Sequence, residues 1–193
     1  MKFQINDKFE KFIPDSFKTD PFTYFESHGK AFRSGEKLID ETGVVQDDPG
    51  AVRAFPVWKD GDKSLHVVAK MVNKKKAKLL GYEDDLHEWK VLEKICEMGL
   101  PCAEPIGWVE QNEEYLILTE KIEGLHFERF KDLDQSIVSK FHEAMDELKK
   151  RFDDHGVERN WYLKDMVIQY DKDADSVTKI VPTDWERTKI SSK

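Results

Sequence analysis

Three polar side chains flank a predicted hairpin near the end of the 193-residue chain. Asn160 and Asp165 precede the apolar run MVIQY, and Asp184 follows the apolar run VTKIV. Both runs have the length and composition of short strands, and the polar turn DKDADS separates them. Because a hairpin brings the residue before its first strand close to the residue after its second, we expect the carboxylates of Asp165 and Asp184 to converge. Such oxygen ligands suit a magnesium ion that is shared with phosphates.

A lysine and a glutamate earlier in the chain could complete a phosphate site. Lys70 lies in the predicted strand LHVVAKMV, and Glu88 lies in a predicted helix further along the chain. Glu88 precedes Leu92 and Ile95 at helical spacing, so it sits beside the apolar stripe and needs a partner. A strand lysine held by a helix carboxylate can present its ammonium to a phosphate. Taken singly, each residue also has an ordinary role, as a solvated lysine, a surface acid or a turn residue.

The first part of the chain predicts a small, hairpin-rich sheet behind an aromatic arm. Residues 1–30 are rich in Phe and predict a short helix or an extended arm with packed aromatic rings. Strand-like runs follow in KAFRSGEKLID, AVRAFPVW and LHVVAKMV, with turns at DDPG and KDGDK. In the last run, the alternation places four apolar side chains on one face, namely Leu65, Val67, Ala69 and Met71.

Two helices and two more pairs of strands complete the prediction. A helix over residues 83–98 ends where Gly99 and Pro101 stop it. PIGWVE and YLILTEKIEG then predict two strands, and a second helix begins after Asp134 and ends before Gly156.

The order of these elements predicts an α+β fold with two lobes. Residues 1–122 form the predicted N-terminal lobe, which contains a small antiparallel sheet, one helix and the N-terminal arm. Residues 123–193 form a minimal C-terminal lobe with the long helix and the hairpin. The two lobes are expected to join near residues 120–124.

Composition and charge narrow the classes of partner. The net charge of −8 argues against general nucleic-acid binding, which needs positive charge. No apolar run approaches the roughly 18 residues of a membrane helix, and the N-terminal residues lack the apolar segment of a signal peptide. Cys96 and Cys102 lack the spacing of metal ligands and fit a reducing cytosol. We therefore expect a cytoplasmic protein with no transmembrane segment and no nucleic-acid partner.

Several segments, taken in order, carry a resemblance to a known family. They are VVAK, HEWKVLEKICEMGLPCAEPIGW, YLILTEKIEG, ERNWYLKDMVI and VPTDWERTKI. Together they resemble the protein-kinase-like fold, and most closely the Kdo/WaaP family of lipopolysaccharide-core sugar kinases. In that family the metal-binding segment reads Asp-Leu-x-Arg, a form that DWER fits. The likeness covers residues 29–190 of the chain.

The resemblance implies ATP and Mg²⁺ as cofactors and assigns roles to four residues. Lys70 would hold the α- and β-phosphates, and Glu88 would orient it. Asp184 would bind Mg²⁺. Asp165 falls where such kinases place their second metal ligand.

The resemblance also implies where the nucleotide base would lie. The segment from Glu120 to Ile122 would be the hinge whose backbone meets adenine. Gly43 and Gly50 are the candidates for the glycine-rich loop that covers the phosphates.

One departure from the family pattern concerns catalysis. Asn160 stands where the resemblance requires the catalytic Asp, and Glu158 stands in place of its His. The Asp orients the substrate hydroxyl and accepts its proton, whereas an amide can orient a hydroxyl but cannot act as a base. Glu158, Asp153 or Asp154 could substitute for the missing base.

Three functions follow as alternatives. The first is an ATP- and Mg²⁺-dependent kinase acting on a hydroxyl of a sugar, a glycan or another small molecule, as in lipopolysaccharide biosynthesis. The second is a pseudokinase that serves as a binding or regulatory module for a protein partner. The third is an α+β interaction domain that binds no nucleotide.

Overall fold

Two compact units make up the chain in this computed structural model, which describes residues 1–31, 52–74, 78, 86–126, 135–162, 165–171, 173–185 and 187–191. The first unit consists of residues 1–85 and 104–121. The second unit consists of residues 86–103 and 122–193. The predicted lobes, residues 1–122 and 123–193, stay a prediction.

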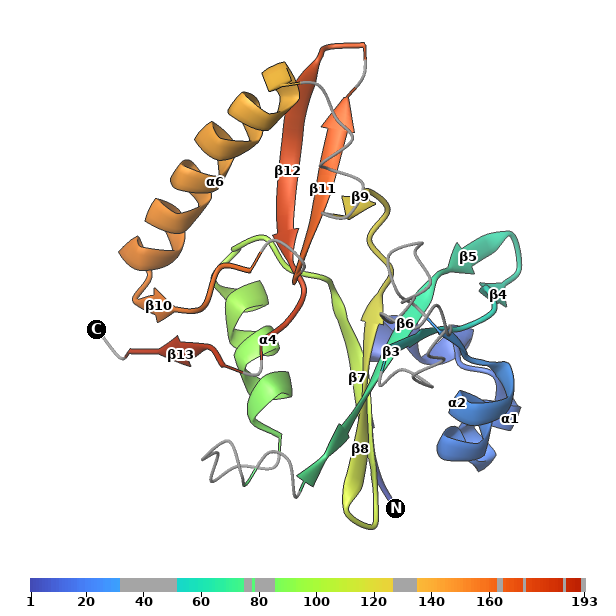
Figure 1. The fold of residues 1–193 in the computed structure, drawn as a ribbon. Helices are drawn as coiled ribbons and strands as arrows, with labels where there is room; N and C mark the ends of the chain where they lie inside the picture. Colours follow the sequence, from blue (N-terminus) through green and yellow to red (C-terminus); the bar gives the residue numbers. More distant parts are fainter. Residues whose placement is uncertain are drawn as a thin grey trace, which may run out of the picture. The chain divides into compact units, whose positions relative to one another are not determined.

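A six-stranded antiparallel sheet forms the centre of the first unit, with the strand order β1-β7-β8-β6-β3-β2 (Figure 1). Its strands are β1 (Lys2–Ile5), β2 (Lys30–Ala31), β3 (Val52–Ala54), β6 (Val67–Asn73), β7 (Pro105–Gln111) and β8 (Glu114–Glu120). Strands β4 (Trp58–Asp60) and β5 (Lys63–Leu65) form a separate hairpin. The predicted alternation is confirmed, since the side chains of Leu65, Val67 and Ala69 are buried and Met71 packs against the same core.

The N-terminal residues belong to this core. They form β1, the short helix η1 (Asp7–Phe12) and the helices α1 (Asp15–Thr19) and α2 (Pro21–His28). Phe17 of α1 is fully buried, and its ring lies 5.5 Å from the ring of Tyr24 and 5.2 Å from that of Trp58. The indole N–H of Trp58 donates to the Tyr24 hydroxyl at 3.1 Å. The expected arm with packed aromatic rings is thus confirmed, although it contains both a strand and helices.

The second unit combines two helices with a hairpin. Its helices are α4 (His87–Glu97) and α6 (Gln135–Asp154). Strands β9 (Leu125–His126), β11 (Met166–Asp171) and β12 (Ser176–Pro182) form a sheet with the order β12-β11-β9, and β10 (Val157–Glu158) pairs with β13 (Lys189–Ile190). Helix α6 lies along β12, as Figure 1 shows.

Both predicted helices are present, and glycines follow their ends. After α4, Gly99 has a φ of +67°, and the Leu100 N–H donates to the Ile95 carbonyl at 3.2 Å, which satisfies a carbonyl of the last turn. After α6, Gly156 has a φ of +70°. The predicted helix residues 83–85 and the predicted cap Asp134 lie outside the described residues.

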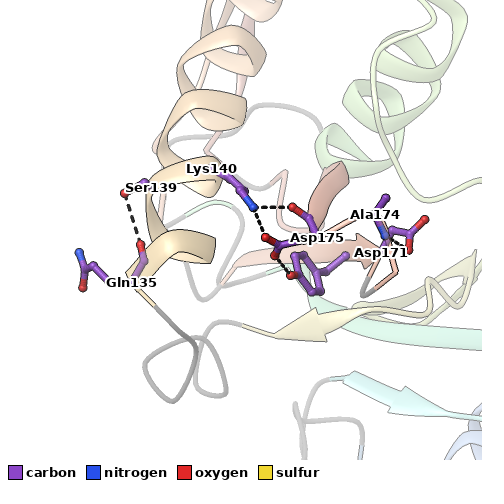
Figure 2. A network of polar contacts seen from close by, with 7 residues as sticks. Gln135, Ser139, Lys140, Asp171, Ala174 and Asp175 are labelled. Atoms are coloured by element: carbon purple, nitrogen blue, oxygen red, sulfur yellow. Dashed lines mark hydrogen bonds and ion pairs between the residues drawn. The ribbon is translucent and has the colours of Figure 1, made fainter.

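A polar network ties α6 to the tip of the hairpin (Figure 2). The Lys140 ammonium donates to the Asp175 carbonyl oxygen at 2.6 Å and to its carboxylate at 2.5 Å. The Tyr170 hydroxyl donates to the other carboxylate oxygen of Asp175. These contacts and the buried stripe of α6 fix the helix against the strands, and that stripe consists of Ile137, Phe141, Met145, Leu148 and Phe152.

In the described part of the chain, no helix combines the length and the apolar character needed to span a bilayer.

Candidate functional site

A pocket in the second unit contains the three polar residues singled out in the sequence. Its lining is Arg159, Asn160, Asp165, Asp184, Arg187 and Thr188. The pocket is partly open to solvent.

The hairpin places the two aspartates. Met166 of β11 pairs with Pro182 of β12, so the residues just outside this pair face each other as well. The Thr183 N–H donates to the Asp165 carbonyl at 2.9 Å, and Asp184 is the next residue. Both half-buried aspartates line the pocket, which is the proximity that the sequence predicted. Their role as metal ligands stays a prediction.

A second strand pair places the other lining residues. Val157 of β10 pairs with Ile190 of β13, and Glu158 pairs with Lys189. Residues 159 and 160 follow β10, while residues 187 and 188 precede β13, so the antiparallel pairing brings these two segments together.

Helix α4 holds the backbone that follows Asp184. Glu88 is buried, with 4% of its surface exposed, and its carboxylate accepts the Trp185 N–H at 3.5 Å. The neighbouring His87 donates from Nε2 to the Thr188 carbonyl at 3.1 Å. A glutamate beside the apolar stripe was expected to need a partner, and the Trp185 backbone is one. The distance is at the long limit of hydrogen bonding, so this contact contributes little by itself.

Arg159, like Arg187 and Thr188, is a pocket residue that was not predicted from the sequence. Its guanidinium carbon lies 4.7 Å from the ring centre of Trp185 and 5.1 Å from that of Trp161. Nε donates to the Asn160 carbonyl at 3.2 Å, whereas the buried Nη1 has no hydrogen-bond partner among the described residues. The local sequence signals only one of these aromatic neighbours, Trp161, because Trp185 lies on a distant segment of the chain.

Neighbouring charges and burial shift the pKa of Arg159 in opposite directions. Burial lowers the pKa of its guanidinium from its ordinary value to about 10, while the negative charges of Asp184 and Asp165 oppose that shift. Arg159 therefore keeps its positive charge at neutral pH.

The chemistry of the lining fits a hard cation only in part. Two carboxylates, an amide and a hydroxyl supply oxygen atoms of the kind that Mg²⁺ prefers. Within the described ranges, however, no group of three His, Cys, Asp or Glu side chains could hold a metal ion. A magnesium ion would thus need further ligands, such as water or phosphate oxygens.

The predicted phosphate-binding pair lies in different units. Lys70 is half-buried in β6, where it pairs with Val52 of β3 and Ile117 of β8, and it belongs to the first unit. Glu88 belongs to the second unit. The contact between the two side chains stays a prediction.

The predicted adenine segment lies at the end of β8. The N–H of Glu120 donates to the Glu104 carbonyl at 2.9 Å, and Ile122 follows as a half-buried residue. Contact of this segment with a nucleotide base stays a prediction. The two predicted loop glycines, Gly43 and Gly50, lie outside the described residues.

Comparison with known proteins gives a match at the level of structure alone. No known family and no curated protein matches the sequence. The fold is similar to that of the kinase PK-1 of Cydia pomonella granulovirus, with a TM-score of 0.50 over 93% of this chain and 14% sequence identity. The chain spans 59% of the length of that viral kinase. This likeness gives no support to the resemblance to the Kdo/WaaP family, which stays a prediction. The chain has a kinase-like fold.

Proposed function

We propose that this protein is a kinase-like phosphotransferase that binds ATP together with Mg²⁺. The observation that carries the proposal is the joint lining of one pocket by Asn160, Asp165 and Asp184, on a kinase-like fold. The positions of Asp165 and Asp184 on either side of the hairpin predict the same proximity from the sequence. Phosphoryl transfer depends mostly on positioning and charge neutralisation, which such a constellation can supply.

The carboxylates of Asp165 and Asp184 would hold the metal, and its charge would neutralise the phosphates. Lys70 would contact the α- and β-phosphates with its ammonium group, and Glu88 would orient Lys70. The contact of Glu88 with the Trp185 backbone supports a link between α4 and the metal segment, because Trp185 directly follows Asp184.

Asn160 limits the rate that this site can reach. Its amide can orient an acceptor hydroxyl but cannot take the proton. Removal of a general base typically costs about 10²–10⁴-fold in rate. The acceptor we propose is a sugar or another small-molecule hydroxyl, as the resemblance to lipopolysaccharide-core kinases implies.

The same residue favours a second function. A pseudokinase would keep the nucleotide pocket and lose transfer, and it would act as a binding or regulatory module for a protein partner. Asn160 in the base position is the specific observation behind this alternative.

Thermal unfolding with and without Mg-ATP tests both functions. At a concentration one hundred times its Kd, a ligand adds about 2.7 kcal/mol to the free energy of unfolding. We expect this rise in the wild type, its loss in Lys70→Met, and its retention in Lys59→Met, which replaces an exposed lysine of β4. Unchanged melting of the wild type with Mg-ATP would exclude both nucleotide-binding functions.

A transfer assay separates the two functions from each other. Labelled ATP is incubated with the protein and candidate sugars, and the label in each sugar is counted. Transfer supports the phosphotransferase. Nucleotide stabilisation with no transfer to any acceptor, and no release of phosphate to water, supports the pseudokinase.

A further inference from the structure

Arg159 is a cation built into the wall of the pocket. Its guanidinium lies against the indole rings of Trp161 and Trp185, and its Nε donates to a backbone carbonyl. Trp185 is buried, and its ring stacks on that of Phe152 at 6.2 Å between centres. A guanidinium held in this way cannot easily leave when another cation arrives.

The charges of the lining balance. Two arginines, Arg159 and Arg187, stand against two aspartates, Asp165 and Asp184. Both aspartates interact electrostatically with Arg159, whereas Arg187 is exposed to solvent and its charge is screened more strongly. A divalent cation that enters alone would therefore meet two carboxylates whose charge is already compensated in part by Arg159.

A phosphate-bearing ligand changes this balance. Its oxygens bring negative charge and can serve as the additional metal ligands that the lining lacks. They can also accept a hydrogen bond from Nη1 of Arg159, the buried donor that has no partner among the described residues. Cation and phosphate would thus stabilise each other in the pocket.

We propose that Arg159 is a positioning residue that serves as the resident counter-ion of Asp165 and Asp184, so that the pocket takes a divalent cation only together with a phosphate-bearing ligand. This inference rests on the proposed function, which assigns Asp165 and Asp184 as the metal ligands. It adds a difference in affinity: the metal alone binds weakly, and the metal–phosphate complex binds tightly.

Thermal unfolding with Mg²⁺ and inorganic pyrophosphate tests the inference without adenine and without turnover. In the wild type, we expect no stabilisation by Mg²⁺ alone and a clear rise in Tm when both are present. In Arg159→Gln, the two carboxylates lose their counter-ion, so Mg²⁺ alone should bind at least about tenfold more tightly than in the wild type. The matched control is Arg151→Gln, which replaces an exposed arginine of α6 outside the pocket and should behave as the wild type does.

Each result bears on the inference. Full stabilisation of the wild type by Mg²⁺ alone would overturn it and leave the Mg-ATP proposal intact. Equal Mg²⁺ titrations of Arg159→Gln and wild type, or no response of either protein to Mg²⁺ with or without pyrophosphate, would also overturn it. Arg159→Lys keeps the charge and should retain the wild-type pattern. If Arg159→Gln does not fold, the inference is tested with the wild type and Arg159→Lys. Stabilisation of either protein by Mg²⁺ alone contradicts the inference. The proposed function is judged separately by its Mg-ATP measurement.

Discussion

The carbonyl oxygen of Asp165 accepts the N–H of Thr183 at 2.9 Å, and this contact continues the strand pairing of the hairpin up to the residue before Asp184. Backbone pairing therefore determines where the two aspartates lie relative to each other in space. A side-chain substitution at either position leaves this pairing in place, so its effect on a ligand can be read without loss of the hairpin.

Asp184→Ala should remove most of the stabilisation by Mg-ATP. The substitution removes one of the two carboxylates proposed to hold the metal. If the affinity drops a hundredfold, a ligand that added about 2.7 kcal/mol to the wild type adds only about 0.4 kcal/mol to the variant. The measurement is the Tm with and without Mg-ATP, and the control is Asp173→Ala at the exposed turn of the hairpin. A shift of wild-type size in Asp184→Ala would refute the metal assignment.

Asn160→Asp should create or accelerate phosphate transfer. The new carboxylate can accept a proton that the amide cannot, and general-base catalysis is worth about 10²–10⁴-fold. Release of inorganic phosphate from ATP, with water as the acceptor, measures this without knowledge of the natural substrate. The double variant Asn160→Asp/Asp184→Ala serves as the inactive reference. Turnover in the variant alone identifies the natural protein as a pseudokinase, whereas equal turnover of variant and wild type argues against the assigned position of the base.

Phe17→Ala should destabilise the first unit strongly. The ring is fully buried among Tyr24, Phe55 and Trp58, so its removal leaves a cavity. Such substitutions lower the free energy of unfolding by about 3–5 kcal/mol. Urea unfolding measures the loss, and Phe3→Ala, at a position with 42% exposure, should stay within about 0.5 kcal/mol of the wild type. Near-equal stability of Phe17→Ala and Phe3→Ala would show that the N-terminal helices are not part of the core.

Glu110→Gln should lose stability at neutral pH and not in acid. The Lys74 ammonium, hydrogen-bonded to Glu110, lowers the pKa of that carboxyl below its ordinary value of 4.5, and Lys2 at 3.2 Å adds to the effect. A pKa that is lower in the folded state means that the charged carboxylate stabilises the fold above pH 4.5, and that this stabilisation is lost as the pH falls through the folded-state pKa.

Urea unfolding at pH 7 should therefore give a free energy about 0.5–1 kcal/mol lower for Glu110→Gln than for the wild type. The difference should shrink with added salt and disappear in acid. Glu147→Gln, which replaces an exposed residue of α6, serves as the control. A difference that grows as the pH falls would contradict the assigned direction of the shift.

Local patterns were enough to predict the hairpin, both helices and the buried face of β6. Each depends on residues close together in the sequence, as in the alternation from Leu65 to Met71. The pairing of β1 with β7, in which Lys2 faces Glu110, could not be predicted, because the short run KFQI specifies no partner so far along the chain. The unit to which α4 belongs could not be predicted either, since an apolar stripe does not identify the surface that it packs against.

The candidate site shows the same division. The proximity of Asp165 and Asp184 could be predicted because a hairpin joins their positions. The place of Arg159 in the site could not be predicted, because it depends on Trp161 and Trp185, which only the folded chain brings to the same guanidinium.

The chain passes between its two units three times, after residues 85, 103 and 121. A single nick in the backbone thus cannot release either unit free of a segment that belongs to the other. The order of synthesis is constrained as well, because β8 lies inside the six-stranded sheet between β7 and β6. A nascent chain must expose residue 120 outside the ribosome before that sheet can close, and until then β1 and β6 lack neighbours that the finished sheet gives them. Early segments of this protein therefore remain without part of their strand pairing until its middle has been made.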